Sequence, residues 1–327
     1  MRLATLKQSG KLDGVLALIS ADGKRLASVA DVCPSLREAL ENWAHVEPLL
    51  RARSLLLEKG MASGQVDSQS VRLESCLPRT WLFADGSAFI HHIRLVRKAR
   101  NAALPETLET VPLMYQAESG RFLAPQEAIP QLDPAHGTDF EAEVGVITDF
   151  VPMGVSADAA LSHIKLVTLI NDVSLRGLIP GELAQGFGFF QSKPNKSLSP
   201  FAVTVDELGP AWRDGRVHLP ICVDLNQKVF GRPHAGEMHF HFGQLIAHAA
   251  RTRSLPAGTL IGSGTVSNEN SALGSGCLAE KRTLEQIQEG SPKTPFLQVQ
   301  DRVEIWMEDA RGRDLFGRIN QVVQRII

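Results

Sequence analysis

A run of alternating acidic and apolar residues marks one strand of the fold. It reads Asp139-Phe140-Glu141-Ala142-Glu143-Val144-Gly145-Val146-Ile147. β-Branched residues follow its acidic part, which predicts a β-strand. Side chains two positions apart point to one face, so we expect the Glu141 and Glu143 carboxylates together, roughly 7 Å apart along the backbone. Charges about 6 Å apart repel by roughly 3 kcal/mol at an effective dielectric near 20. A half-buried strand therefore needs a positive charge between them.

Two aspartates follow apolar runs in a similar way. Asp172 comes after the run at residues 166–170, and Asp85 comes after Trp81-Leu82-Phe83. Four carboxylates at the ends or faces of apolar strands suit a hard divalent cation, which takes oxygen ligands in an octahedral arrangement. The spacing of Glu141 and Glu143 alone would fit an acidic pair on the solvated face of an antiparallel strand equally well. A metal site and a solvated acidic pair therefore both stay open at this point.

The order of further motifs along the chain carries a family resemblance. The motifs are Asp85-Gly86-Ser87-Ala88-Phe89-Ile90-His91-His92, Glu141-Ala142-Glu143, Asn171-Asp172-Val173-Ser174-Leu175-Arg176, Lys193, Gly264-Thr265-Val266-Ser267 and Glu280. In this order and at about these spacings, the sequence resembles the fumarylacetoacetate hydrolase family from about Leu77 to the C-terminus. Each motif alone is weak evidence for the family, whereas the whole set in this order is specific for it.

The resemblance implies a fold, a cofactor and an active site. The implied fold is a strand-dominated α+β structure, the family's distorted β-roll. The implied cofactor is a Mg²⁺ ion (or Ca²⁺ or Mn²⁺) bound by Asp85, Glu141, Glu143 and Asp172. The implied catalytic groups are His92 as general base, Glu280 as its carboxylate partner, and Lys193. The implied substrate contacts are Arg176, Tyr115 and Thr265.

The implied reaction is hydrolysis of a carbon–carbon bond in a 2,4-dioxo acid. Fumarylacetoacetate, a related β-diketone acid from aromatic amino-acid (tyrosine) degradation, is the first candidate substrate, and fumarylpyruvate or another acylpyruvate follows closely. Two alternatives stay open. One is a 2-oxo acid decarboxylase, hydratase or isomerase on the same fold, and the other is a non-catalytic binding protein of that fold. The His92 and Glu280 pair favours hydrolysis.

The chain departs from the family's animal members at positions that concern the substrate. Ile179 stands where those members have a glutamine, and Asn101 stands where they have an arginine. The loop after Lys193 is one residue shorter, which leaves open whether Ser197 replaces a threonine of the metal shell. The expected metal ligands and base are unchanged.

Several of these residues have ordinary explanations when taken alone. A lone loop lysine such as Lys193 is usually exposed to solvent, and Glu280 resembles a surface residue. Tyr115, the single tyrosine of the chain, could be a core aromatic with a satisfied hydroxyl. His91 competes with His92 as the base, and the spacing within the first motif selects His92.

Composition permits this interpretation without requiring it. The chain has 327 residues, 43% hydrophobic and 21% charged, which fits one large domain or two smaller ones. A formal net charge of −2 gives no electrostatic case for nucleic acid or an anionic membrane. No apolar run reaches the length of a membrane span and no signal-peptide pattern is present, so we expect a soluble cytoplasmic protein. Four cysteines without metal-type spacing are expected as reduced, mostly buried thiols.

The organisation of the chain changes near residue 75. We predict a small N-terminal α+β domain at residues 1–75 and the catalytic domain at residues 76–327. In the first part, strands are expected at residues 2–7, 14–19 and 25–29. A capping box at Ser35 opens a helix, Pro48 is expected to open a second helix that ends at Gly60, and residues 60–70 are predicted to form a connector. The resemblance further implies a homodimer.

Overall fold

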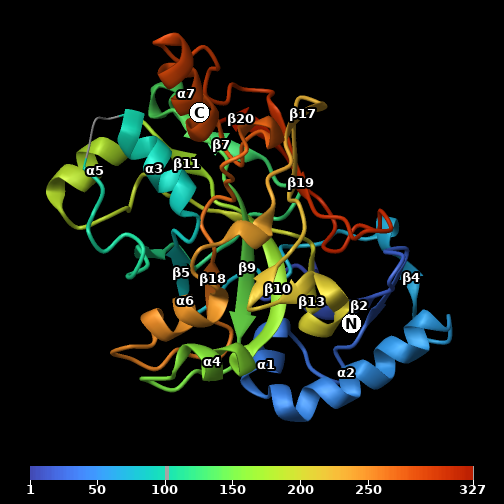
Figure 1. The fold of residues 1–327 in the computed structure, drawn as a ribbon. Coiled ribbons are helices and arrows are strands. Elements are labelled where there is room, and N and C mark those ends of the chain that lie inside the picture. Colours follow the sequence, from blue (N-terminus) through green and yellow to red (C-terminus); the bar gives the residue numbers. More distant parts are fainter. Residues whose placement is uncertain (100–102, 327) are drawn as a thin grey trace.

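The centre of the protein is one large mixed sheet (Figure 1). The structure is a computed structural model that describes residues 1–99 and 103–326. Ten of the eleven strands follow one another in space, and β12 (Ser197–Leu198) pairs with β10 off this path. The spatial order is β4 (Val66–Asp67), β3 (Arg25–Ser28), β2 (Val15–Ile19), β1 (Arg2–Leu6), β13 (Phe201–Thr204), β10 (Ile164–Asn171), β9 (Ala142–Thr148), β18 (Leu260–Gly262), β5 (Phe83–Gly86) and β6 (Met114–Ala117).

Smaller sheets and seven α-helices surround this sheet in the described part of the chain. The five-stranded sheet has the order β17 (Lys228–Gly231), β16 (Cys222–Leu225), β19 (Arg302–Trp306), β20 (Ile319–Arg325) and β7 (Ile129–Gln131). The two-stranded sheets pair β11 (Ser174–Leu175) with β8 (Thr138–Asp139), and β14 (Trp212–Arg213) with β15 (Arg216–Val217). The helices are α1 (Leu36–Glu41), α2 (Trp43–Glu58), α3 (Ile90–Ala99), α4 (Ala157–Ala160), α5 (Ile179–Gln185), α6 (Phe242–Ala249) and α7 (Leu278–Glu289).

Strands β9 and β10 form the buried middle of the large sheet. All seven residues of β9 are buried, and its antiparallel register with β10 sets Glu143 opposite Ile170. Gly145 is a weak strand former that packing nevertheless requires here. A Cβ at Gly145 would lie 2.7 Å from Cδ1 of Ile170 and 3.1 Å from Cδ1 of Leu260. Glycine in a strand interior often marks such a close approach.

The N-terminal strands extend the sheet that carries the acidic run. β1 pairs with β13, with Leu3 opposite Ala202, and β13 pairs with β10. One hydrophobic cluster contains Leu3 and Leu50 from the N-terminal part together with Ile170 of β10. The division of the chain near residue 75 stays a prediction, because both the sheet and this cluster cross that boundary.

The helices and strands of the N-terminal part agree with those predicted from the sequence, with two differences. The three expected strands are β1, β2 and β3, and Oγ of Ser35 caps α1 by accepting from the Glu38 N–H. The predicted start of the second helix is wrong, because α2 begins at Trp43 and contains Pro48. Burial of Trp43 and Leu50 on one face outweighs the backbone hydrogen bond that the proline cannot donate. The expected connector also contains β4, which pairs with β3.

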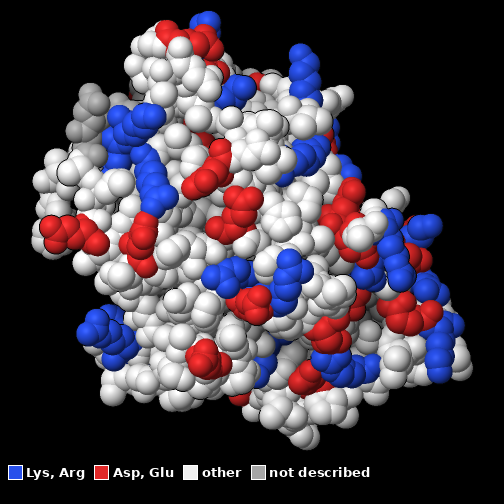
Figure 2. Space-filling model, viewed as in Figure 1, with Lys and Arg blue, Asp and Glu red and all other residues white. Residues whose placement is uncertain are grey.

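The surface and the cysteines agree with the composition. Acidic and basic side chains are interspersed over the face shown in Figure 2. None of the helices in the described residues has the length and apolarity needed to cross a membrane. All four cysteines are free and buried, as expected: Cys33, Cys76, Cys222 and Cys277.

We expect Gly145→Ala to lower the free energy of unfolding by about 1–3 kcal/mol, because the added methyl group overpacks the interface of three strands. Urea unfolding monitored by circular dichroism measures the loss. Gly181→Ala is the matched control, since a Cβ there meets nothing within 4 Å. Equal stability of Gly145→Ala and the wild type would contradict the packing argument.

Candidate active site

Three buried carboxyl groups converge on one point. Asp85 comes from β5, Glu143 from β9, and Asp172 directly follows β10. One oxygen of each lies within 4.8 Å of the others. Asp85 Oδ1 and both carboxyl oxygens of Glu143 lack a hydrogen-bond partner among the described residues. Buried carboxylate oxygens without partners are costly, and a hard cation with oxygen ligands would satisfy them. The residues present therefore fit a divalent metal ion.

Glu141, the fourth expected ligand, is held by two cations. Nη2 of Arg176 donates to its Oε1 at 2.6 Å, and Nζ of Lys193 donates to its Oε2 at 2.8 Å. The same Nζ also donates to Oδ2 of Asp172 at 2.6 Å. The expected positive charge is thus present but contacts only one of the two glutamates, because Lys193 donates to Glu141 and no described side chain donates to Glu143. Membership of Glu141 in the ligand set stays a prediction, because the group of three meets without it.

The pKa values of the carboxyl groups differ between Glu141, which contacts two cations, and Asp85 and Glu143, which contact none. Burial raises the pKa of Asp85 to about 8 and that of Glu143 well above its usual range, and neighbouring negative charges add to both shifts. Burial acts in the same direction on Glu141, but the charges of Lys193 and Arg176 outweigh it and hold the pKa of Glu141 well below its usual range. The raised pKa values favour the protonated forms of Asp85 and Glu143, so a cation that binds there competes with protons.

Asp139 belongs to the site although no role was predicted for it. It is fully buried and accepts a hydrogen bond from Nε of Arg176 at 2.9 Å. It also accepts from the backbone N–H groups of Leu278 and Ala279 at the start of α7. Asp139 lies two residues before Glu141, so the alternation that singled out the acidic pair could have identified it too.

Lys196 is the second charged residue without a predicted role. Its side chain is fully buried, and Nζ lies 3.1 Å from Oδ1 of Asp172. Ser197, considered for the metal shell, instead hydrogen-bonds through Oγ to the backbone oxygens of Ala124 and Leu198. No periodicity in this loop distinguishes a buried lysine from an exposed one, so the sequence offers no signal for Lys196.

The charges of the site do not balance when all its carboxyl groups are ionised. Apart from Glu280, which pairs with His92, five carboxyl groups lie in it: Asp85, Asp139, Glu141, Glu143 and Asp172. Three cationic side chains contact Asp139, Glu141 and Asp172 among them: Arg176, Lys193 and Lys196. One divalent cation would supply the two missing positive charges.

His92 and Glu280 form a pair between two helices. His92 lies in the first turn of α3 and Glu280 in the first turn of α7. Nδ1 of His92 is 2.9 Å from Oε2 of Glu280, whose side chain is 2% exposed. An ionised carboxylate can only accept, so with Glu280 ionised a neutral His92 carries its proton on Nδ1 and has a lone pair on Nε2. The structure thus brings together the residues expected as base and partner.

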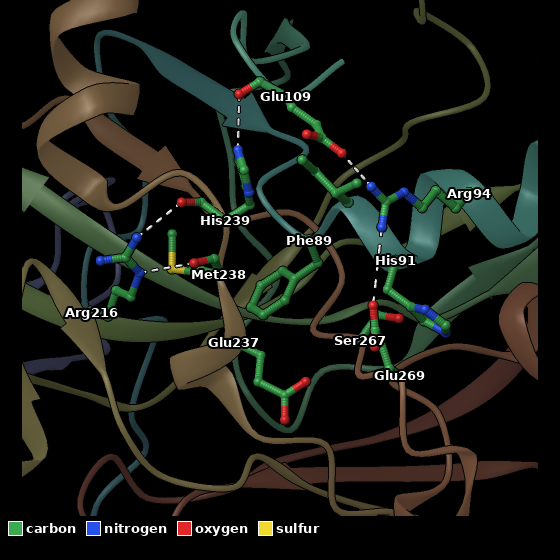
Figure 3. Close-up of a pocket in the computed structure, with 11 residues that line it drawn as sticks. Phe89, His91, Arg94, Glu109, Arg216, Glu237, Met238, His239, Ser267 and Glu269 are labelled. Atoms are coloured by element: carbon green, nitrogen blue, oxygen red, sulfur yellow. Dashed lines mark hydrogen bonds and ion pairs between the residues drawn. The ribbon is translucent and has the colours of Figure 1, made fainter. Parts of the chain in front are cut away.

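His91 lines a different cavity from His92. Figure 3 shows His91 near Ser267 and Glu269, beside the ion pair of Arg94 and Glu109. This cavity measures about 540 Å³. His92 instead lines the smaller cavity above the carboxylates. The choice of His92 from spacing agrees with this geometry, and its role as a base stays a prediction.

The small cavity brings the predicted site residues together. It measures about 130 Å³, and seven of the ten predicted residues line it: Asp85, His92, Tyr115, Glu141, Arg176, Lys193 and Thr265. The other three lie behind these: Glu143 and Asp172 meet Asp85, and Glu280 meets His92. Asn101, noted as a departure from the family, lies outside the described residues.

Tyr115 contacts the acidic cluster directly. Its hydroxyl donates to Oδ2 of Asp172 at 2.9 Å, and its ring packs edge-on against Phe189 at 5.0 Å. Burial and the charge of Asp172 raise the pKa of Tyr115 well above its usual value. The hydroxyl therefore orients a carboxylate of the site, a contact that the sequence did not predict.

Sequence comparisons match residues 1–79 and 82–324 to two models of fumarylacetoacetase-type domains. The model described as fumarylacetoacetate (FAA) hydrolase C-terminal matches residues 82–324, and the one described as fumarylacetoacetase N-terminal domain 2 matches residues 1–79. The chain is 25% identical to fumarylacetoacetase of Caenorhabditis elegans over 68% of its own length and 64% of that protein, so it spans just under two thirds of this relative. It is 28% identical to 2,4-didehydro-3-deoxy-L-rhamnonate hydrolase of a Sphingomonas species, over 76% and 78% of the two chains.

Solved structures share the fold and include both hydrolases and isomerases. Maleylpyruvate hydrolase from Sphingobium sp. SYK-6, in complex with manganese(II) and pyruvate, has a TM-score of 0.66 and 15% identity over 99% of both chains. A 5-carboxymethyl-2-hydroxymuconate delta-isomerase from Mycobacterium smegmatis has a TM-score of 0.64 and 17% identity over 100% of both. The expected strand-rich α+β fold is confirmed.

We expect the affinity for Mg²⁺ or Mn²⁺ to rise between pH 6 and pH 8. The raised pKa values of Asp85 and Glu143 mean that the cation must displace protons, so lowering the pH weakens binding. Isothermal titration calorimetry at several pH values, in buffers of different ionisation enthalpy, measures the affinity and the protons released. Glu143→Gln should abolish binding, and Glu304→Gln, on a distant strand, should not. A pH-independent affinity would contradict the assignment.

Proposed function

The chain belongs to the fumarylacetoacetate hydrolase family, and on that premise we propose that it is a metal-dependent hydrolase that cleaves a carbon–carbon bond in a 2,4-dioxo acid. The observation that carries the proposal is the His92–Glu280 contact of 2.9 Å at the edge of a cavity floored by carboxylates. A base is needed for hydrolysis, because water must be deprotonated before it attacks a carbonyl carbon.

His92 and Glu280 would act on the water. Nε2 of His92 takes a proton from the water as its oxygen attacks the C4 carbonyl, and Glu280 stabilises the imidazolium that forms. The C3–C4 bond of the tetrahedral intermediate then breaks, and its electron pair moves onto C3 and the C2 oxygen as an enolate. His92 returns the proton to C3. The products are a carboxylic acid and a 2-oxo acid.

Lys193 would act on the other half of the substrate. Its ammonium group donates to Glu141, Asp172 and Ser174 beside the cavity, which uses all three of its protons. Exchange of the bond to Ser174 would let it donate a charge-assisted hydrogen bond to the developing enolate oxygen. A divalent cation held by Asp85, Glu143 and Asp172 would supply Lewis-acid stabilisation of negative charge on the dioxo acid. We propose Mg²⁺ as that cation, with Mn²⁺ and Ca²⁺ as alternatives.

An isomerase or decarboxylase of 2-oxo acids is the second candidate function. The fold is shared with an isomerase, and those reactions also need a stabilised enolate. They do not need a base that makes hydroxide from water. Product analysis separates the two functions, because only the hydrolase releases a carboxylic acid and a 2-oxo acid from each substrate molecule.

The family resemblance also supports a homodimer as the working assembly. Size-exclusion chromatography with light scattering tests this part of the proposal directly. A mass near twice 35.6 kDa supports the dimer, and a mass near 35.6 kDa excludes it.

We expect His92→Ala to lower kcat/KM on an acylpyruvate by about 10²–10⁴-fold, the usual contribution of a positioned general base. Steady-state assays of 2-oxo acid release measure the effect. Metal affinity should be unchanged, because His92 is assigned no ligand role.

His91→Ala is the matched control, since this neighbouring histidine lines the other cavity; its activity should be close to wild type. Near-normal turnover by His92→Ala would exclude it as the base. A fully additive loss in the double variant with Glu280→Gln would mean that the two residues do not act as a unit.

A further inference from the structure

A second cavity adjoins the small one beside the carboxylates. It measures about 430 Å³, which is within the range of small-molecule sites. Four residues line both cavities: His92, Arg176, Ile179 and Phe189. A dioxo acid whose reacting carbons lie beside His92 would therefore extend its acyl group into this outer cavity.

Hydrocarbon side chains dominate the wall of the outer cavity. They come from α3, α5, α7 and the segments that follow α5 and α7. The apolar lining consists chiefly of Val96, Ile179, Leu183, Phe189, Pro292 and Phe296. Ile179 lies at the junction of the two cavities, where the family's animal members have a glutamine. An apolar wall favours an apolar group, because burial removes both surfaces from water.

The two cationic side chains of the outer cavity differ in their contacts, because only Arg176 is paired with carboxylates. Arg176 donates to Asp139 and Glu141. Arg282 stacks on Phe296, with 4.1 Å between Cζ and the ring centroid, and its Nη1 donates to a backbone oxygen. A carboxylate at the far end of a substrate would be desolvated against a mainly hydrocarbon wall. Arg282, the lining cation without a carboxylate partner in the described residues, is held by the ring of Phe296 and a backbone oxygen, so burying the carboxylate there is unfavourable.

We propose that the outer cavity is an acyl subsite for a hydrocarbon group, so that the substrate is an acylpyruvate with an aliphatic or aromatic acyl chain rather than a fumaryl one. This inference rests on the proposed function and narrows its substrate class. Each methylene group buried in such a pocket contributes about a fourfold gain in kcat/KM or affinity.

The test compares acetylpyruvate, butanoylpyruvate, hexanoylpyruvate and fumarylpyruvate with the metal-loaded wild-type enzyme. We expect kcat/KM to rise from acetyl to hexanoyl by at least tenfold, and to be at least tenfold higher for hexanoyl than for fumaryl. A preference for fumarylpyruvate would overturn the inference. If that preference disappears in Arg282→Met, Arg282 is instead an anchor for a distal carboxylate.

Leu183→Arg tests the subsite by placing a positive charge in its apolar lining. Leu183 is 45% exposed, so the longer polar side chain can be accommodated without disrupting the core. The hexanoyl to fumaryl ratio of kcat/KM should fall by at least tenfold. Phe187→Arg is the matched control, because Phe187 is fully exposed and places the same charge on the same segment. Equal ratios in the two variants would contradict the subsite.

Binding measurements distinguish failure of this inference from failure of the proposed function. If none of the four compounds is cleaved, the hydrolase proposal is wrong, and their dissociation constants still test the subsite. Tighter calorimetric binding of hexanoylpyruvate than of fumarylpyruvate, weakened by Leu183→Arg, would support a hydrocarbon subsite in a protein of other activity. Tighter binding of fumarylpyruvate would overturn it.

Discussion

The ammonium group of Lys193, buried between the carboxylates of Glu141 and Asp172, is the interaction on which the site depends. Removing five carboxylates from water beside one another is unfavourable unless positive charges accompany them. Lys193, Lys196 and Arg176 compensate part of that charge. Asp85 and Glu143 are left without a contacting cation, and their pKa values are raised first by burial and then by the neighbouring negative charges. The protein thus folds around a site that one divalent cation would complete.

The large sheet fixes the positions of these groups. The backbone N–H of Asp172 donates to the carbonyl of Glu141 at 3.0 Å, which sets the end of β10 beside the start of β9. Gly262 of β18 leaves room for Asp85 on the neighbouring strand, since a Cβ there would lie 2.2 Å from Oδ1 of Asp85. The register of β9 and β10 therefore fixes Glu143 and Asp172, and the lack of a side chain at Gly262 leaves the space that Asp85 occupies.

Local patterns in the sequence predicted the strands and the acidic pair, since these depend on alternation within a few residues. The motif order, through the family resemblance, identified residues that the fold brings together from distant positions, such as His92 and Glu280. Local patterns could not predict the start of α2, because burial of Trp43 overrides the preference of Pro48 for a first turn. Burial of Lys196 and the pairing of β1 with β13 also escaped prediction, because both depend on contacts far apart in the chain.

Anomalous diffraction from a crystal grown with Mn²⁺ tests the central claim most directly. The account predicts a single strong peak within about 2.0–2.6 Å of oxygen atoms of Asp85, Glu143 and Asp172, with Lys193 still in contact with the cluster. A peak elsewhere, or none at saturating Mn²⁺, would contradict the claim that this carboxylate cluster is a metal site.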